Sequence, residues 1–474
     1  MKLPQRCYGS VRLLENGHPC VKNVELIDLN ALPMIETMCE NGLRVDLTHF
    51  ERMGVELVRD MEAITEKVRQ QTGYYANLNS GDQVADLLFK KLGIKQARAK
   101  MTRGGSNKES RESVEDAVLT AIQHEHECVV HIQDFKELSK LLSTYIKPMP
   151  KLASHVGHDN WRMYPNLSYT RVPSGRLACK EPNLLAMPNR TERGRQVCEG
   201  FICDPGYVYL SADLSQIEPR IATHRSQDPN LLHIYRNHED IYSAFATMAF
   251  RLKDERYFDR NKGEWVYPTV DRKAHRFPAK TCILASIYSV TAKGLLEQMP
   301  VVCANCLKEA TKHDCSRFKA LWTEEKCQEI ITAFYQEYKF LLKMQKADHQ
   351  FAMKYGYIGD MWGRIWHSAA VYSVHDYVVA EALRVVTNHP IQASAAGVIK
   401  LVMAATFDDL TDAGMLDLCR PVLQIHDELL FECREDMAEE LGSMVTWRMQ
   451  TAVKLSISIE AGTATASSWG LISK

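Results

Sequence analysis

The sequence predicts an α+β protein, in which long helical segments lie on both sides of short strands. Apolar residues recur at helical spacing over 24–71 and 113–146, and through most of 228–345, where a polar loop at 254–268 interrupts them. Short apolar runs such as 207–210 and 422–425 end at polar residues, which is typical of strands. Proline and glycine punctuate 148–175, where we predict strands and turns.

Composition and charge exclude several classes of protein. The chain has 474 residues, of which 25% are charged, and its net charge is −1. It contains no apolar run long enough for a membrane span and no signal-peptide pattern, so we expect a soluble, intracellular, cytoplasmic protein. The 14 cysteines are then expected to be reduced thiols, and some of them are candidates for a metal site.

The segment VLQIHDELLFEC, residues 422–433, predicts a β-hairpin. Apolar residues flank the polar centre His426-Asp427-Glu428, which places two carboxylates at the tip. Such carboxylates are either exposed turn residues or metal ligands, and this segment alone leaves both interpretations open.

A further carboxylate follows a strand far upstream. In VYLSADLSQIEPR, residues 208–220, the apolar run ends at Asp213 and a helical pattern follows. Two strand-end aspartates, here Asp213 and Asp427, can share a pair of Mg²⁺ ions, which prefer oxygen ligands and also bind substrate phosphates. Such a pair activates an attacking oxygen and stabilises a leaving oxygen in phosphoryl transfer.

The segment RFPAKTCILASIYS predicts a helix that begins near Pro278. Arg276 and Lys280 then lie beside a helix N-terminus, where unpaired N–H groups and the helix dipole favour phosphate. Leu284 and Tyr288 continue the four-residue spacing and would present a surface to a base. The alternative is an ordinary amphipathic helix with a basic start.

Residues 90–111 are rich in Lys and Arg, including Lys100 and Arg103, and contain the sequence Gly-Gly-Ser-Asn. They predict a flexible basic loop, which is either a solvated surface or a clamp for a phosphate backbone.

The stretch VVCANCLKEATKHDC offers four candidate Zn²⁺ ligands within a short loop: Cys303, Cys306, His313 and Cys315. Cys327 is a substitute fourth ligand. The alternatives are incidental reduced cysteines and a redox switch.

Several stretches resemble family A DNA polymerases, the group of bacterial DNA polymerase I and its phage relatives. DLSQIEPR resembles motif A of that family, the spacing of Arg276, Lys280 and Tyr288 resembles motif B, and QIHDE resembles motif C. SGRLACKEPNLLAMP, RVVTNHPIQASAA, and NSGDQVADLLFKKLG with KLLSTYI resemble further stretches of the family. The resemblance covers nearly everything from residue 25 onward.

This resemblance implies a right-hand fold, with an antiparallel sheet in the palm and mainly helical thumb and fingers. It places an N-terminal extension at 1–24, the thumb at 25–150, the first part of the palm at 151–225, the fingers at 226–344 with a cysteine-rich insertion at 301–315, and the rest of the palm, with the catalytic hairpin, at 345–474.

The resemblance also implies DNA-templated DNA synthesis, in which a primer 3′-hydroxyl is extended with dNTPs, two Mg²⁺ ions take part, and pyrophosphate is released. The implied catalytic residues are Asp213, Asp427 and Glu428, and the backbone carbonyl of Leu214 is a further Mg²⁺ ligand. The implied nucleotide contacts are Arg276, Lys280, Leu284, Tyr288, Gln216 and Glu218, of which Tyr288 and Glu218 would exclude a 2′-hydroxyl. The implied DNA contacts are Arg176, Asn388, Gln392, Arg384 and His426, together with Lys100 and Arg103.

The chain departs from the family pattern in several places. Leu284 stands where the family usually has Phe or Tyr, and Tyr242 stands where a His normally touches the triphosphate. Pro219 replaces a Leu of motif A and disfavours helical geometry at Glu218. Because the thumb begins near residue 25, we expect no intrinsic proofreading exonuclease. The expected partners are primer-template DNA and dNTPs, with replisome proteins or a separate exonuclease as further candidates.

Two other functions stay open. A single-subunit RNA polymerase shares similar palm motifs, although Glu218 with Tyr288 argues against it. A catalytically inactive, DNA-binding replisome scaffold is the second, and the intact Asp213, Asp427 and Arg276 argue against that. A phage-type role in replication or gap filling fits the expected lack of a nuclease.

Overall fold

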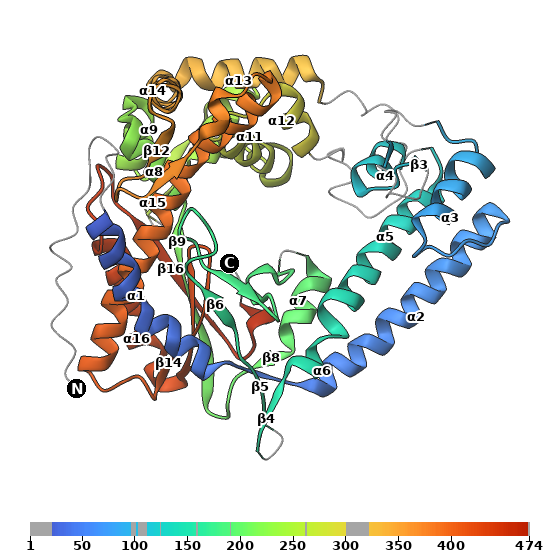
Figure 1. Cartoon of the computed structure of the whole chain (residues 1–474), viewed down its shortest axis with the longest axis horizontal. Helices are drawn as coiled ribbons and strands as arrows, with labels where there is room; N and C mark the ends of the chain where they lie inside the picture. Colours follow the sequence, from blue (N-terminus) through green and yellow to red (C-terminus); the bar gives the residue numbers. More distant parts are fainter. Residues whose placement is uncertain are drawn as a thin grey trace.

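A four-stranded antiparallel sheet lies at the centre of the computed structural model (Figure 1). The structure describes residues 21–95, 101–102, 111–123, 125–157, 160–189, 191–260, 263–299 and 322–472. The strand order is β14-β15-β9-β16, with β9 (Tyr207–Ser215), β14 (Cys419–Ile425), β15 (Glu428–Arg434) and β16 (Glu460–Ala466). The predicted α+β class is therefore confirmed.

Strand β9 is buried on both faces. Consecutive side chains of a strand point to opposite faces, yet Tyr209, Leu210, Ser211 and Ala212 are all buried. Helix α16 (Ala438–Thr451) packs on β9 and β16, and α1 (Val21–Asn41) packs on β14. The ends of these strands are therefore held by a rigid sheet that is covered by helices.

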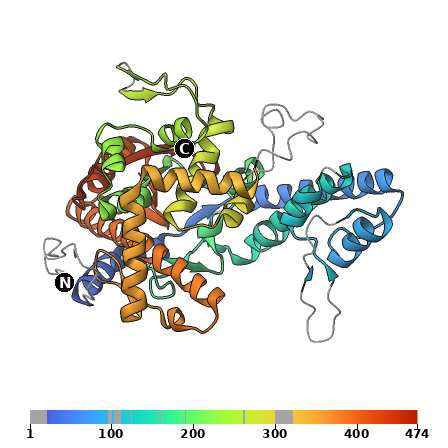
Figure 2. The ribbon, with the colours of Figure 1, turned by 90° about the horizontal axis from the view of Figure 1, so that it is seen from above.

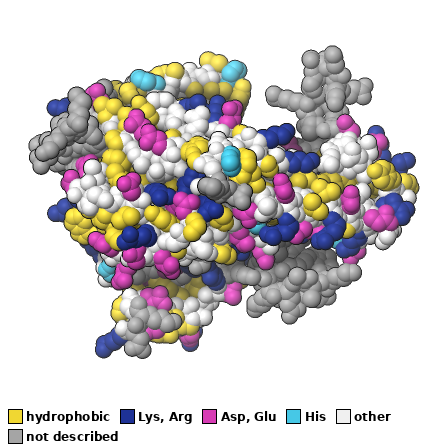
Figure 3. All heavy atoms as spheres, turned by 90° about the horizontal axis from the view of Figure 1, so that it is seen from below, with side chains coloured by type: hydrophobic (Ala, Val, Ile, Leu, Met, Phe, Trp, Pro, Cys, Tyr) yellow, Lys and Arg dark blue, Asp and Glu magenta, His cyan; other side chains and the backbone are white. Residues whose placement is uncertain are grey.

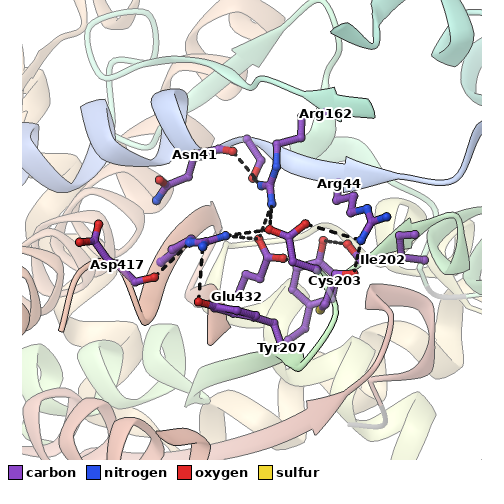
Figure 4. A network of polar contacts seen from close by, with 12 residues as sticks. Asn41, Arg44, Arg162, Ile202, Cys203, Tyr207, Asp417 and Glu432 are labelled. Carbon is purple, nitrogen blue, oxygen red and sulfur yellow. Dashed lines mark hydrogen bonds and ion pairs between the residues drawn. The ribbon is translucent and has the colours of Figure 1, made fainter. Parts of the chain in front are cut away.

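A partly buried network of charges joins this sheet to a second one (Figure 4). The second sheet has the order β4-β5-β1-β8, with β1 (Leu43–Val45), β4 (Ser154–Gly157), β5 (Asn160–Met163) and β8 (Phe201–Ile202). Arg162 of β5 lies 2.6 Å from Asp204 and 3.1 Å from Glu432 of β15, and Arg420 of β14 lies 2.8 Å from Asp204. Because removing one partner of a buried pair such as Arg162–Glu432 costs about 3–5 kcal/mol, the network fixes β15 against the second sheet.

Two long helices, α2 (Leu47–Thr72) and α5 (Glu127–Leu141), run side by side away from the sheets (Figures 1 and 2). Helix α2 begins where Asp46 accepts the N–H groups of Thr48 at 3.0 Å and His49 at 3.2 Å. A separate apolar core that includes Val68, Leu88 and Phe135 holds the far end of this arm together. The other elements of the arm are α3 (Gly81–Ala85), η2 (Asp86–Lys91), β2 (Met101–Thr102), β3 (Arg111–Glu112), α4 (Asp116–Ile122), η3 (Leu142–Ile146) and α6 (Met149–Leu152).

A helical layer lies at the top of Figure 1 and comes from the chain between β9 and α15. Its elements are α8 (Ile217–Ser226), α9 (Pro229–Arg236), α10 (Ile241–Ala249), η5 (Arg272–Arg276), α11 (Phe277–Ile287), α12 (Ala292–Gln298), α13 (Glu324–Glu337) and α14 (Lys339–Tyr355). Helix α11 has Pro278 in its first turn, as predicted, because proline needs no N–H partner there.

The polar stretch 254–268 is not a plain loop, so that prediction was wrong. It contains the hairpin of β10 (Tyr257–Asp259) and β11 (Glu264–Val266). The rings of Phe258 and Trp265 meet edge to face at 5.7 Å, and the Trp265 indole donates to the carbonyl oxygen of Asn237 at 2.9 Å. These aromatic contacts stabilise strands in a segment whose composition is mostly polar.

Helix α15 (Asp376–Asp412) runs beside α1 and α8. It alone among the described helices is long and apolar enough to cross a membrane, but 89% of its most apolar window is buried inside the protein, as in a core helix. The Trp362 indole donates to the carbonyl oxygen of Ser394 at 3.0 Å, and a Cβ on Gly397 would lie only 2.1 Å from that indole nitrogen. Glycine is therefore required at 397 for the tryptophan to pack against the helix.

Short elements complete the fold: β6 (Asn166–Ser168), β7 (Ala178–Lys180), η4 (Leu184–Ala186), α7 (Glu192–Glu199), β12 (Tyr357–Gly359), β13 (Ile365–His367), η7 (Ala369–Tyr372), η8 (Glu435–Met437) and η9 (Trp469–Leu471). On the face in Figure 3, Lys and Arg side chains are interspersed with Asp and Glu, in keeping with the net charge of −1.

Candidate active site

Asp213 and Asp427 lie at the same end of the central sheet. Asp213 is the register partner of Glu428 across β9 and β15, and Asp427 immediately precedes Glu428 in the turn between β14 and β15. The N–H of Leu214 donates to the carbonyl oxygen of Asp427 at 3.1 Å. The backbone therefore brings together two aspartates that are far apart in the sequence.

Glu428 differs from its sequence expectation. The sequence predicted it at the tip of the hairpin, but it is the first residue of β15, it is only 2% exposed, and its carboxylate accepts a hydrogen bond from the Ser211 hydroxyl. A strand residue must point to one face of the sheet, and here that face is covered. Its catalytic role stays a prediction.

The turn itself has a restricted backbone. His426 has a φ of 57°, a left-handed conformation that His adopts more readily than most residues. The side-chain amide of Gln424 donates to the His426 carbonyl oxygen. These features fix the direction in which the chain presents Asp427.

Arg276 and Lys280 lie at the beginning of α11, beside the first turns of α10. Asp240 binds the Arg276 guanidinium through both carboxylate oxygens, at 2.8 and 3.0 Å. Both cations also lie over the ring of Tyr242, at 5.1 Å for Arg276 and 5.5 Å for Lys280. Lys280 is exposed, and Leu284 is partly exposed one turn further along the same face of the helix.

Tyr242 connects these cations to the carboxylates. Burial raises the pKa of Tyr242 to about 12; Asp240, Glu218 and Asp427 also raise it, whereas Arg276 lowers it. The charges of Arg276, Glu218 and Asp427 therefore all act on the same phenol, that of Tyr242. This places the start of α11, motif A and the hairpin turn around one site.

Glu218 links three elements. Its two carboxylate oxygens accept hydrogen bonds from Arg176 and from the Tyr288 hydroxyl. Burial and the neighbouring Glu218 carboxylate raise the pKa of Tyr288 well above its usual value, while Arg176 and a hydrogen bond with Gln392 lower it. Arg176 is thus a partner of Glu218 in this structure, and its predicted contact with DNA stays a prediction.

The other predicted contacts lie around this network. Gln216 has a φ of 55° just before α8, and its side-chain oxygen accepts from the Tyr235 hydroxyl at 3.1 Å. Arg384, Asn388 and Gln392 lie on one face of α15 at four-residue spacing. Arg384 is exposed and pairs with Glu381, whereas the Asn388 side-chain oxygen is buried without a hydrogen-bond partner among the described residues.

The donor set at the hairpin suits Mg²⁺. Among the described residues, no three His, Cys, Asp or Glu side chains form a complete metal-binding group. Mg²⁺ does not need one, because it binds through one or two carboxylates and completes its shell with waters and substrate phosphates. Asp213 and Asp427 are such a pair, held in place by the backbone.

Some predicted residues lie outside the described part of the chain. These are Lys100 and Arg103 of the basic loop, and the candidate zinc ligands Cys303, Cys306, His313 and Cys315. Asp240 was missed by sequence reasoning. Its spacing to Ser243 is typical of a helix N-cap, but nothing in the sequence indicates its pairing with Arg276, which is 36 residues further along.

Comparisons with known proteins identify the fold and the family. A solved structure, the POL domain of Pol1 from M. smegmatis in complex with DNA primer-template and dNTP, superposes with a TM-score of 0.78 at 25% identity, covering 95% of this chain and 72% of that one. The fold is therefore the right hand of a polymerase domain. The chain also matches the family model for DNA polymerase family A over residues 47–471, and it belongs to that family.

Bacterial relatives match almost the whole chain. It is 29% identical over 470 residues to the thermostable DNA polymerase I of Thermus filiformis, an alignment that covers 98% of this chain and 51% of that protein. It is 28% identical over 444 residues to DNA polymerase I of Chloroflexus aurantiacus, with coverage of 91% and 42%. The chain thus spans about half the length of the curated relatives that it matches.

Proposed function

We propose that this chain is a DNA-templated DNA polymerase that extends a primer 3′-hydroxyl with dNTPs and releases pyrophosphate. The observation that carries the proposal is the position of Asp213 and Asp427 at one end of the sheet, where Asp427 lies within electrostatic reach of the Tyr242 phenol, whose ring also contacts Arg276 and Lys280. Carboxylates on one side and cations on the other suit a metal-bound triphosphate.

Asp213 and Asp427 would hold two Mg²⁺ ions, with the Leu214 carbonyl as a further ligand. When bound, such ions activate the primer 3′-hydroxyl and stabilise charge on the triphosphate and the leaving pyrophosphate. Arg276 and Lys280 neutralise the triphosphate at the start of α11, where the helix dipole adds to their charge. Glu428 supports the hairpin from its buried position.

Glu218 and Tyr288 select the sugar. Their hydrogen bond joins α8 to the end of α11, so both side chains are held in one place. In that place they would leave no room for a 2′-hydroxyl, which favours dNTPs over NTPs and argues against an RNA polymerase. Arg384, Asn388, Gln392 and His426 would contact the DNA strands.

Primer extension tests the proposal directly. A labelled primer annealed to a longer template is incubated with Mg²⁺ and either dNTPs or NTPs. We expect template-directed extension with dNTPs, little with NTPs, and none after chelation of Mg²⁺. Extension only with NTPs would establish an RNA polymerase. Tight DNA binding without any extension would establish a scaffold.

We propose a division into subdomains that is supported by the packing of the elements. We assign the thumb to the part of 25–150 that forms the helical arm, and the fingers to 226–344. The palm comprises 151–225 and 345–474, together with α1, which packs on α15 and β14. The basic loop with Lys100 and Arg103 would then bind the DNA backbone, and its contribution would weaken as salt rises.

We also propose that Cys303, Cys306, His313 and Cys315 bind a structural Zn²⁺ ion, because the C-x-x-C spacing suits tetrahedral coordination. Elemental mass spectrometry of wild type and of a Cys303→Ser, Cys306→Ser variant tests this. About one zinc per chain, lost in the variant, supports the site, and metal-replete protein without zinc contradicts it. A phage-type role and action in the cytoplasm are further proposals, and the relatives named above are bacterial.

A further inference from the structure

The ring of Tyr242 supports both cations of the nucleotide-binding helix. Tyr242 lies in the first turn of α10, where it is only 4% exposed. The guanidinium carbon of Arg276 lies 5.1 Å from the centre of the ring, and the ammonium nitrogen of Lys280 lies 5.5 Å from it. Both distances are within the range in which an aromatic ring attracts a cation.

Asp240, two positions before Tyr242, holds Arg276 from another direction. Asp240 caps α10 by accepting hydrogen bonds from the N–H of Ser243 at 2.9 Å and from its hydroxyl at 2.6 Å. The same carboxylate binds Arg276 at 2.8 and 3.0 Å. Asp240 is therefore fixed by its own helix, and Arg276 rests between a fixed carboxylate and a buried ring.

We propose that Tyr242 is a positioning residue for the incoming nucleotide, whose aromatic ring holds Arg276 and Lys280 in place for the triphosphate. This inference rests on the function proposed above and deepens it. The ring acts through the two cations, so its hydroxyl is not required.

Two observations separate the ring from the hydroxyl. No hydrogen bond to the Tyr242 hydroxyl is found among the described residues, whereas the face of the ring has two cationic partners. Burial raises the pKa of Tyr242 to about 12, so the phenol stays neutral at physiological pH and adds no charge to the site. Side chains of Arg and Lys are long and lose conformational entropy when a ligand orders them. A ring that orders them beforehand reduces that cost.

The test compares Tyr242→Phe with Tyr242→Leu. Phenylalanine keeps the ring, so we expect KM for dNTP and kcat to stay close to wild type. Leucine removes both cation–ring contacts, so we expect KM for dNTP to rise about 5- to 30-fold while kcat changes little. Inorganic pyrophosphate should inhibit Tyr242→Leu less strongly by a similar factor, because it binds the same cations.

Phe245→Leu is the matched control. Phe245 lies one turn further along α10, is 1% exposed, and packs edge to face on Phe334 at 5.5 Å. The Phe245→Leu substitution should lower the thermal stability of the same helix. Because this side chain contacts neither cation, KM for dNTP should not change. An equal rise in KM in this control would show that destabilising α10 is sufficient to raise KM for dNTP, and this result would refute the proposal.

The remaining outcomes are also decisive. An equal loss in Tyr242→Phe would assign the effect to the hydroxyl, and an unchanged Tyr242→Leu would show that the ring is dispensable. If wild-type protein extends no primer, the proposed function fails by itself. Calorimetric binding of Mg²⁺–dNTP to the same variants would then still measure whether the ring positions the cations.

Discussion

The N–H of Leu214 donates to the carbonyl oxygen of Asp427 at 3.1 Å and so ties the end of β9 to the turn of the β14–β15 hairpin. Asp213 directly precedes Leu214, so this one backbone bond sets the spacing between the two aspartates without using either side chain. Backbone groups thus position the carboxylates, as the proposed binding of metal and substrate at this site would require.

Neutralising either aspartate should abolish chemistry while leaving the fold intact. We expect Asp213→Asn and Asp427→Asn each to lower the single-turnover rate of primer extension on the order of 10³-fold, because the amide keeps the shape but loses the charge that binds Mg²⁺. DNA affinity and melting temperature should stay close to wild type. Asp412→Asn, which changes an exposed carboxylate at the end of α15, serves as the control. Wild-type rates in either aspartate variant would contradict the assigned role.

Breaking the Glu218–Tyr288 contact should relax sugar selection. We expect Glu218→Ala and Tyr288→Phe to lower the ratio of kcat/KM for dNTP over NTP by about 10-fold or more, because a side chain held beside the sugar is lost or released. Tyr335→Phe is the matched control: the Tyr335 hydroxyl donates to the Ser286 carbonyl at 2.8 Å, away from Glu218. A selectivity ratio that moves equally in all three variants would refute this explanation.

The buried Asp360 should make stability depend on pH. Burial raises the pKa of Asp360 from its ordinary 3.8 to about 6. Hydrogen bonds from the N–H groups of Arg364 at 2.8 Å and Trp362 at 2.9 Å act in the opposite direction and lower this pKa. Between these two pH values the folded chain keeps a proton that the unfolded chain has lost, so this carboxyl group lowers stability as pH rises through the window. At neutral pH the penalty is at most about 3 kcal/mol.

Asp360→Asn keeps an oxygen acceptor for both N–H groups and cannot ionise. We therefore expect its free energy of unfolding, relative to wild type, to increase as pH rises from 4 to 6 and then to level off. Urea denaturation of both proteins at several pH values measures this, and taking the difference cancels the other titrating groups. A difference that is independent of pH would count against the buried, ionising carboxylate.

Gly397 should resist even the smallest side chain. Gly397→Ala places a Cβ 2.1 Å from the Trp362 indole nitrogen, so we expect a loss of about 1–3 kcal/mol of stability. Gly54→Ala is the matched control within another helix, where the nearest heavy atom to a new Cβ is the Cγ2 methyl of Ile146 at 3.3 Å. There the helix propensity of alanine should offset the contact. Similar melting temperatures for the two variants would contradict the packing argument.

The sequence predicted much of the fold and of the candidate site, because the patterns that indicate strands, turns and helix ends are local in the sequence. Apolar runs and turn residues identified the strand that carries Asp213 and the hairpin that carries Asp427, and Pro278 located the beginning of α11, since proline fits only a first helical turn. The order of the motifs identified the family, and with it the face of α11 that we propose to bind the nucleotide.

Only the tertiary structure determined which residues that are far apart in the sequence contact one another. The register of β9 against β15 buries Glu428, whereas the hairpin pattern left open whether its carboxylates are exposed turn residues or metal ligands. The pairing of Asp240 with Arg276, the contact of the Tyr242 ring with two cations, and the hydrogen bond between Glu218 and Tyr288 join residues that are 34 to 70 positions apart. A sequence pattern reports which face of its own helix or strand a residue occupies. Which partner meets that face depends on how the elements pack, because contacts between side chains act over a few ångströms in space, whatever their separation along the chain.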